Sequence, residues 1–322
     1  MEETLQKREL STTPRRSDKI FRRVVAAGAF TSLIILGLIT LFLANRSVGI
    51  FQDFGFKFVT GFEWNPGDPE NGVPAQLGIG AMLIGSLLIA ATGLVMALPI
   101  AVGTALFLTY YVPNWLKKPL TIVVDLMAAI PSVIYGLWGF FVLMPHAVYW
   151  AKLLNKYLGW IPLFDVPSKV FERSPFIAGI VIGIMIIPII TAITREVFSQ
   201  VPLDRIQAAY ALGATKWSMI RTVVLPYGSS GIASGAMLGL GRALGETVAV
   251  YLVLNIYFIP NFYLLFSAGG NIASLIVSKF GEANEYELQG LMAAGLVLFV
   301  ITLIVNYLST FIVKRTSRTG GQ

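Results

Sequence analysis

Two oppositely charged residues, Arg242 and Glu246, lie in the long apolar stretch 228–256. They are four positions apart, so on a continuous helix they would share one face. Arginine suits an oxyanion because its planar guanidinium donates two parallel hydrogen bonds. Two interpretations follow. The residues form an ion pair that fixes helix packing, or they form an anion site in which Glu246 holds the guanidinium and keeps binding weak enough for release.

The composition is that of a polytopic membrane protein. Of the 322 residues, 56% are hydrophobic and only 13% are charged, as is typical of chains with several membrane-spanning segments. A charge near the centre of a bilayer costs about 2.5–3.5 kcal/mol, so Arg242 and Glu246 predict a cavity or pathway. The absence of cysteine excludes disulfides and thiolate metal sites, and the single histidine, His146, argues against an imidazole metal site. The net charge of +7 is attributed to cytoplasmic loops and predicts no nucleic-acid binding.

Six apolar segments are long enough to cross a membrane. They cover approximately residues 24–44, 77–109, 120–144, 175–198, 228–256 and 288–313. With six crossings, the two ends of the chain and the connections between the second and third segments and between the fourth and fifth lie on one side of the membrane. Most of the 24 Lys and Arg residues fall in or next to these four regions. Since Lys and Arg concentrate on the cytoplasmic side, the sequence predicts an all-α membrane protein of six transmembrane helices with both termini in the cytoplasm, in the cell inner membrane.

These segments also predict the organisation of the chain. In order, we expect a cytoplasmic tail (1–23), a first transmembrane helix (24–44), an extracytoplasmic loop (45–76), a core of five transmembrane helices (77–313) with a cytoplasmic loop at 199–227, and a second cytoplasmic tail (314–322). Within the core, residues 145–174 and 257–286 are expected to be outer loops.

The third apolar segment has a proline in its middle. Pro131 is followed in the same segment by Gly136 and Gly139. Such residues leave backbone N–H and C=O groups without partners in the helix, and a membrane tolerates these only where neighbours or a water-lined cavity satisfy them. We therefore predict that Ser132 and Tyr135 lie, together with Arg242 and Glu246, along a translocation path.

A polar, helix-prone segment, Gln207–Pro226, separates the fourth and fifth apolar segments. Asp204 is the predicted N-cap of a first short helix, and Gly213 is predicted to end it because glycine tolerates the left-handed conformation of a helix C-terminus. A second short helix is expected from Thr215 until Pro226 stops it. Two short helices joined at a glycine would form a rigid knob on the cytoplasmic side.

The same segment resembles the coupling loop of permease subunits of ATP-binding-cassette (ABC) importers. The family pattern is Glu-Ala-Ala, three residues, Gly, nine residues, then Ile-x-Leu-Pro. The matching residues, with the spacing kept and glutamine in place of the acid, are Gln207, Ala208, Ala209, Gly213, Leu225 and Pro226. The resemblance implies that this loop docks into a groove on a cytoplasmic ATPase.

Two further stretches, GLGRALGETVAV around Arg242 and IPSVIYGLWG from Ile130, resemble phosphate-importer permeases of the PstC type. The resemblance extends over about residues 20–315. It implies a type I ABC importer permease core that forms a heterodimer with a homologous second permease (PstA type). It also implies two ATP-binding subunits (PstB type) and an extracytoplasmic phosphate-binding protein (PstS type). Inorganic phosphate would be the cargo. The partner ATPase would bind ATP and Mg, and this chain would hold no cofactor.

Alternatives to this interpretation remain open. The chain has no glycine-rich phosphate loop, so it is not the ATP-hydrolysing subunit. An importer of another oxyanion (sulfate, molybdate or phosphonate) would share the architecture. A membrane-embedded enzyme would need paired intramembrane acids, a Ser/His dyad or a metal cluster, and a receptor or scaffold would use the cytoplasmic loop to bind a signalling protein. Asp125 and Arg195, near the inner ends of the third and fourth segments, are expected to anchor helix ends or to gate an exit.

Overall fold

The computed structural model describes residues 16–67, 72–166 and 168–319, which are mostly helical. In chain order the elements are α1 (Arg16–Phe54), α2 (Lys57–Thr60), β1 (Trp64–Asn65), β2 (Gln76–Leu77), α3 (Gly80–Leu106), η1 (Phe107–Tyr111), α4 (Asn114–Ala129), α5 (Ser132–Trp138), η2 (Gly139–Leu143), α6 (Met144–Leu158), η3 (Pro162–Phe164), α7 (Pro175–Ser199), α8 (Leu203–Ala211), α9 (Lys216–Met219), η4 (Ile220–Val224), α10 (Leu225–Leu244), α11 (Val248–Val253), α12 (Ile272–Phe280) and α13 (Glu285–Thr319).

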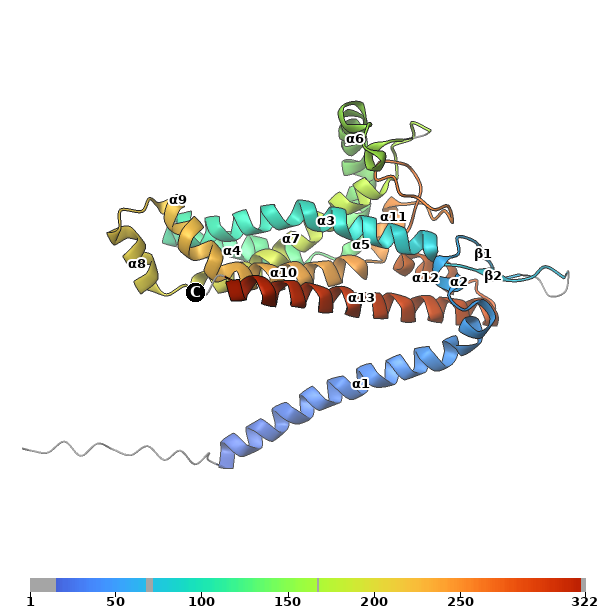
Figure 1. The fold of residues 1–322 in the computed structure, drawn as a ribbon, viewed down its shortest axis with the longest axis horizontal. Coiled ribbons are helices and arrows are strands. Elements are labelled where there is room, and N and C mark those ends of the chain that lie inside the picture. Colours follow the sequence, from blue (N-terminus) through green and yellow to red (C-terminus); the bar gives the residue numbers. More distant parts are fainter. Residues whose placement is uncertain (1–15, 68–71, 167, 320–322) are drawn as a thin grey trace, which may run out of the picture.

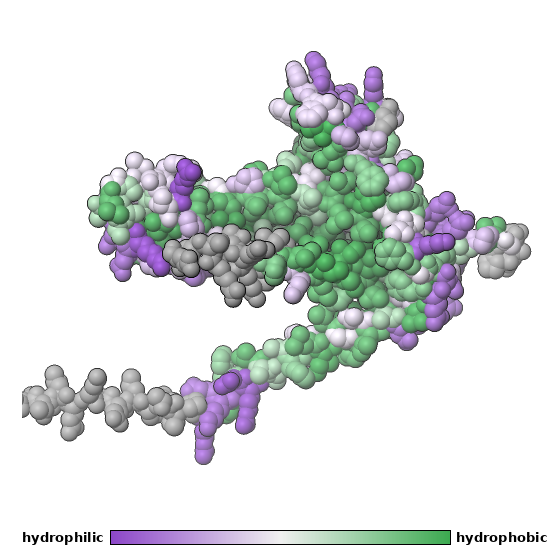
Figure 2. Space-filling view, viewed as in Figure 1, coloured by the Kyte–Doolittle hydropathy of each residue, from purple (hydrophilic) through white to green (hydrophobic). Residues whose placement is uncertain are grey.

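Six helical stretches of these described residues are long and apolar enough to cross a membrane. They are Arg16–Phe54, Gly80–Tyr111, Ser132–Leu158, Pro175–Ser199, Lys216–Leu244 and Glu285–Leu308. Figure 2 shows apolar residues along the middle of the bundle and hydrophilic residues gathered toward its ends. The prediction of an all-α fold with six membrane-spanning helices is confirmed.

The first and last helices are longer than their apolar segments. α1 begins at Arg16 and ends at Phe54, so the predicted tail and loop on either side of the first span are partly helical. α13 continues to Thr319, into the predicted second tail. A helix satisfies its own backbone hydrogen bonds in water as well as in lipid, so leaving the membrane does not require it to end. Residues 1–15 and 320–322 of the predicted tails lie outside the described residues.

The third predicted span is divided at its proline. α4 ends at Ala129, Ile130 and Pro131 are extended, and α5 begins at Ser132. This follows from the restriction that a proline places on the residue before it, which disfavours the helical conformation. The break thus confirms that Pro131 interrupts the helix, and it separates α4 from the helical run that follows.

The outer loop predicted at 145–174 is wrong over α6. This helix buries Met144, Ala147 and Ala151, which are three and four positions apart, against the rest of the chain. Such spacing gives a helix one apolar stripe. The lysines and aromatic residues on the other faces of α6 led to the prediction of a loop. In Figure 1, α6 stands across the long direction of the bundle.

The core of the bundle is built on α7, which packs against α3 on one side and α10 on another. A Cβ added at Gly93 of α3 would lie 3.1 Å from the carbonyl oxygen of Gly179 in α7, so the two backbones touch. Along α10, glycines recur every three or four residues and are buried against α7 at Gly228, Gly231, Gly235 and Gly239. These small residues let α10 approach α7 closely, as small side chains do in membrane helices.

The two ends of the bundle differ in what they carry. The start of α1, the end of α13 and the α8–α9 segment lie at one end (Figure 1), as an even number of crossings requires. At the other end lie α12 and the two-stranded antiparallel sheet in which Trp64 pairs with Leu77. We call these the coupling end and the opposite end.

Candidate functional site

The predicted fifth span is broken at Glu246. α10 ends at Leu244 with Gly245 as its cap, and α11 begins at Val248. The prediction that Arg242 and Glu246 share one helix face is therefore wrong, and no ion pair joins them in the part of the chain that the structure describes. Glycine is about 1 kcal/mol less favourable than alanine inside a helix, and at this position it ends the helix instead of continuing it.

Glu246 is buried, with 7% of its surface exposed, and is held on two sides. Its Oε1 accepts a hydrogen bond from the backbone N–H of Ala249, in the first turn of α11, at 3.4 Å. Its main-chain oxygen accepts a hydrogen bond from Nδ2 of Asn271 at 2.6 Å. The free N–H groups at a helix N-terminus stabilise an acidic side chain. Glu246, which precedes the N-cap Thr247, therefore accepts a hydrogen bond from the first turn of α11, and among the described residues it forms no ion pair with Arg242.

Asn271 joins this break to α12 and α3. Its Oδ1 accepts the N–H of Ser274 at 2.8 Å, and the Ser274 hydroxyl oxygen accepts the N–H of Asn271 at 3.1 Å, which makes a reciprocal cap at the start of α12. The next residue, Ile272, donates its N–H to Oγ of Ser86 in α3 at 3.0 Å. All these polar side chains are buried. We call Ser86, Glu246, Asn271 and Ser274 the polar junction.

Arg242 lies in the last turn of α10 and is exposed. A cation at this place is favoured by the partial negative charge of the helix C-terminus. The side chain is therefore open to the surroundings of this chain, and among the described residues Glu246 does not take up its donors.

Tyr135 spans the break in the third span. Its hydroxyl donates a hydrogen bond of 2.8 Å to the main-chain oxygen of Met127, near the end of α4. The last carbonyls of a helix lack partners within that helix, so Tyr135 satisfies one of them across Pro131. Ser132 is the first residue of α5 and is half-buried.

The two breaks lie close together because α5 packs against α11. A Cβ added at Gly136 would come within 2.8 Å of the Leu252 side chain and 3.0 Å of the Ala249 Cα, so only glycine lets the helices approach this closely. Three of the residues predicted along the path thus lie in or next to this pair of short helices, Ser132 and Tyr135 in α5 and Glu246 just before α11. Arg242 lies in the last turn of α10, on the other side of the break. That they line a path remains a prediction.

At the coupling end, α8 and α9 form the predicted pair of short helices. Gly213 lies between them with φ +79, the left-handed conformation predicted for it. The prediction that Asp204 is the N-cap is wrong, because α8 is preceded by Pro202 and Asp204 lies in its first turn. Proline presets the chain direction there, and an acid in the first turn still benefits from the helix dipole. Thr215 caps α9, its Oγ1 accepting the N–H of Ser218 at 3.2 Å.

The prediction that Pro226 stops the second helix is also wrong. The helix runs unbroken from Lys216 to Leu244, and Pro226 lies in the first turn of α10 directly after the wide π turn η4. A π turn shifts the hydrogen-bonding pattern by one residue, which accommodates a residue that has no N–H. Leu225, beside it, is half-buried.

The coupling end exposes large apolar side chains on a well-anchored base. Met219, Ile220 and Val224 are buried in a cluster with Phe198 and Val201. Beyond this base, the exposed fractions are 70% for Leu203, 44% for Tyr210, 90% for Leu212 and 60% for Trp217. We call these four residues the coupling surface. Of the motif residues beside it, Gln207 and Ala208 are exposed and Ala209 is half-buried. Four large apolar side chains this exposed within one short segment are consistent with an interaction surface.

Asp125 and Arg195, predicted as helix anchors or gate residues, are brought together. Nη2 of Arg195 in α7 lies 3.8 Å from Oδ1 of Asp125 in α4, with 21% and 49% of the two side chains exposed. This pair links the two helices. Partly exposed pairs contribute only about 0–1 kcal/mol, so the pair carries little of the stability of the fold.

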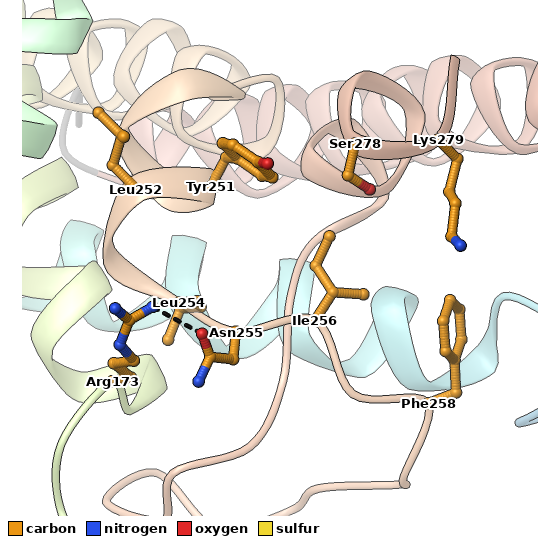
Figure 3. A pocket seen from close by; sticks show the side chains of 9 residues that line it. All are labelled: Arg173, Tyr251, Leu252, Leu254, Asn255, Ile256, Phe258, Ser278 and Lys279. Atoms are coloured by element: carbon orange, nitrogen blue, oxygen red, sulfur yellow. Dashed lines mark hydrogen bonds between the residues drawn. The ribbon is translucent and has the colours of Figure 1, made fainter. Parts of the chain in front are cut away.

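Sequence reasoning missed three residues that the fold places near α11. Asn271 had a local signal, because an asparagine three positions before Ser274 is the pattern of a helix start. Arg173 and Lys279 had none, since they are far apart in the chain and read only as basic residues of outer loops. In the structure both line one hollow beside α11, shown in Figure 3.

Comparison with protein families places the chain among transport proteins. Residues 97–318 match the family described as "Binding-protein-dependent transport system inner membrane component". The chain is 44% identical over 295 residues to "Phosphate transport system permease protein PstC 2" of Mycobacterium tuberculosis, a match that covers 91% of this chain and 90% of that one. It is 38% identical over 309 residues to "Phosphate transport system permease protein PstC" of Haemophilus influenzae, covering 95% and 96%.

Solved structures share the fold at low sequence identity. One chain of a bacterial alginate ABC transporter, in complex with an alginate pentasaccharide-bound periplasmic protein, has a TM-score of 0.60 and 18% identity, covering 94% of this chain and 99% of that one. A second structure, of an ABC transporter involved in the import of alginate, has a TM-score of 0.51 and 17% identity, with 92% and 99% covered. The fold is that of a type I ABC importer permease.

These matches confirm the predicted family and a transport subunit rather than an enzyme. The family description names its members as components of a transport system that depends on a binding protein, so the chain works together with other ABC components. The six apolar helices make it a multi-pass membrane protein. The chain belongs to the binding-protein-dependent transport system inner membrane components and, among them, to the PstC family of phosphate transport system permeases.

Proposed function

We propose that this chain is a transmembrane permease subunit of an ATP-driven importer of inorganic phosphate, and that Arg242 lies on the phosphate path. The names of its relatives support phosphate as the cargo. The chemistry of Arg242 agrees with this, because an exposed guanidinium offers planar, paired donors to a tetrahedral oxyanion. Two helix breaks beside it supply the irregular backbone that membranes tolerate where a path is lined.

One geometric observation carries the mechanism. A single helical stretch, Lys216–Leu244, begins with α9 at the coupling end and has Arg242 in its last turn. At 1.5 Å per residue it is about 43 Å long. A displacement of the coupling surface would therefore move Arg242 as part of one rigid body. Closure of the ATP-binding subunits on ATP would in this way switch the chain between two packings.

The partners follow from this mechanism. A homologous second permease of the PstA type would complete the path on the side that Arg242 faces. Two ATP-binding subunits of the PstB type would bind ATP and Mg and dock on the coupling surface. An extracytoplasmic phosphate-binding protein of the PstS type would deliver the anion to the opposite end. The excess of Lys and Arg supports a cytoplasmic location for the coupling end and both termini.

The motif residues have defined roles in this proposal. Gly213 sets the angle between α8 and α9, and Asp204, Gln207, Ala208 and Ala209 lie on α8. Leu225 and Pro226 lie at the start of α10. A hollow of about 470 Å³ between α8 and α10, lined by residues that include Ala208, Leu212 and Pro226, offers a recess to a side chain of the ATPase.

Uptake measurements test the cargo. Cells without their own high-affinity phosphate system would receive this chain with its neighbouring subunits, and labelled phosphate uptake would be measured with sulfate, molybdate and phosphonate as competitors. We expect phosphate uptake that the competitors leave unchanged. Strong competition, or uptake of another oxyanion alone, would keep the importer architecture and contradict phosphate as the cargo.

A further inference from the structure

We propose that the hollow lined by Arg173 and Lys279 is a transient phosphate-binding site. It would hold the anion between release from the extracytoplasmic binding protein and arrival at Arg242. This inference rests on the proposed function, since it takes phosphate as the cargo and the opposite end as the outer one. We call the hollow the outer anion pocket.

The outer anion pocket lies beside α11 and α12, away from the coupling end (Figure 1). Its volume is about 510 Å³, within the range of about 300–1,000 Å³ that small-molecule sites occupy. Three segments supply its walls, namely the loop before α7, the residues from α11 to Phe258, and the last turns of α12. In Figure 3, Arg173 and Lys279 come from opposite sides, and Tyr251 and Ser278 lie between them on one wall.

The lining has the chemistry of an anion site. It contains two cations, Arg173 and Lys279, and no Asp or Glu. Both cationic side chains are half-buried, which strengthens their attraction for an anion relative to that of freely solvated side chains. The hydroxyl of Tyr251 and the amide of Asn255 add hydrogen-bond donors, whereas the Ser278 hydroxyl already donates to the main-chain oxygen of Leu275. A small oxyanion matches this set better than a sugar or an apolar ligand would.

The guanidinium of Arg173 is held in place by two contacts, and its backbone is strained. Its Nη1 donates a hydrogen bond of 2.6 Å to Oδ1 of Asn255. Its carbon Cζ lies 4.7 Å from the centre of the Phe140 ring, a cation–π contact. Its backbone has φ 50, the left-handed region that a non-glycine residue occupies at a cost of about 1–3 kcal/mol and that recurs at functional sites. The fold thus fixes this cation although its backbone conformation costs free energy.

The break between α10 and α11 separates Arg242 from the pocket, which lies beside α11. Tyr251 of the pocket belongs to this helix, and Arg242 lies just beyond the break at Glu246. α11 has six residues, which corresponds to about 9 Å. An anion released at the opposite end would therefore meet one cationic site beside α11 and a second one beyond the start of this short helix. Neighbouring sites of moderate strength permit both entry and exit along a path.

The proposal predicts a loss of coupling when the charge of Lys279 changes. The whole complex would be reconstituted in vesicles with loaded binding protein outside and ATP inside, and phosphate taken up per ATP hydrolysed would be measured. Phosphate that is released but not captured escapes outward, so Lys279→Glu should lower this ratio at least about ten-fold, which corresponds to about 1.4 kcal/mol. Lys279→Gln should lower it less, and Lys279→Arg should keep most of it.

A matched variant controls for charge alone. Lys152 lies on α6, is exposed and does not line the pocket, so Lys152→Glu makes the same charge change elsewhere and should keep the ratio. An unchanged ratio in Lys279→Glu would overturn the proposal. The proposal would also be overturned if Lys279→Glu needed more loaded binding protein for half-maximal ATP hydrolysis but kept its ratio of phosphate to ATP. That result would assign Lys279 to docking of the binding protein. Absence of phosphate uptake by the wild-type complex would instead contradict the proposed function.

Discussion

The side-chain amide of Asn271 donates a hydrogen bond of 2.6 Å to the main-chain carbonyl of Glu246. This contact joins the break between α10 and α11 to the start of α12, across 25 positions of sequence. Both residues are buried, so a carbonyl left without its donor would cost about 1–3 kcal/mol. The contact therefore sets where α11 starts, and with it the spacing between Arg242 and the outer anion pocket.

Asn271→Ser separates the two tasks of Asn271. Serine is also a good N-cap, so α12 keeps its cap, but its shorter side chain does not reach the carbonyl of Glu246. We expect a loss of about 1–3 kcal/mol in the free energy of unfolding, measured by thermal unfolding of the purified complex in detergent. Ser278→Ala, in the same helix, serves as a control with a small effect. Wild-type stability of Asn271→Ser would show that only the cap matters.

Arg242 and Glu246 should behave as independent residues. Because Glu246 accepts a hydrogen bond from the first turn of α11 and no ion pair joins the two among the described residues, their substitutions should add. In a double-mutant cycle of Arg242→Gln and Glu246→Gln, we expect a coupling energy below about 0.5 kcal/mol in the stability of the complex. A coupling of more than about 1 kcal/mol would restore the structural ion pair as the reason for both charges.

Gly213 should tolerate asparagine and reject proline. Its φ of +79 is outside the range of proline, whereas asparagine enters the left-handed region most readily after glycine. No atom lies within 4 Å of an added Cβ, so conformation and not space decides the outcome. We expect Gly213→Pro to insert in the membrane but to lose co-purification with the ATPase, and Gly213→Asn to retain it. Co-purification of the proline variant at the wild-type level would contradict a fixed angle between α8 and α9.

The sequence predicted best where local rules decide the structure. α7 has almost the predicted bounds because its residues from Pro175 to Ile190 form one apolar run, and Gly213 has the predicted conformation because few residues other than glycine adopt it. The prediction failed where neighbours decide. α10 contains several glycines and continues through them, and only the polar junction around Glu246 and Asn271 explains why the helix ends at the next one, Gly245.

The candidate site was also predictable only where a local sequence signal exists. Arg242 stood out because a charge in an apolar segment is rare, but its partner was assigned to Glu246 from spacing alone. Spacing holds only on a continuous helix. Arg173 and Lys279 carry no such signal, since their meeting depends on how α7, α11 and α12 pack together.

The orientation of the chain is open to a direct test, since it contains no cysteine. Single cysteines placed at exposed positions would report their side of the membrane without any background substitution. Lys152→Cys on α6 should react with an impermeant maleimide in intact spheroplasts, and Gln200→Cys, between α7 and α8, should react only after permeabilisation. The opposite pattern would invert the proposed topology.

Phosphate uptake by the Arg242 variants tests the central claim most directly. Arg242→Gln removes the charge and the paired donors, and Arg242→Lys keeps the charge only. At equal amounts of assembled complex, we predict that uptake falls at least about ten-fold in Arg242→Gln, equivalent to about 1.4 kcal/mol, and to an intermediate level in Arg242→Lys. Wild-type uptake by Arg242→Gln would contradict a place for Arg242 on the phosphate path.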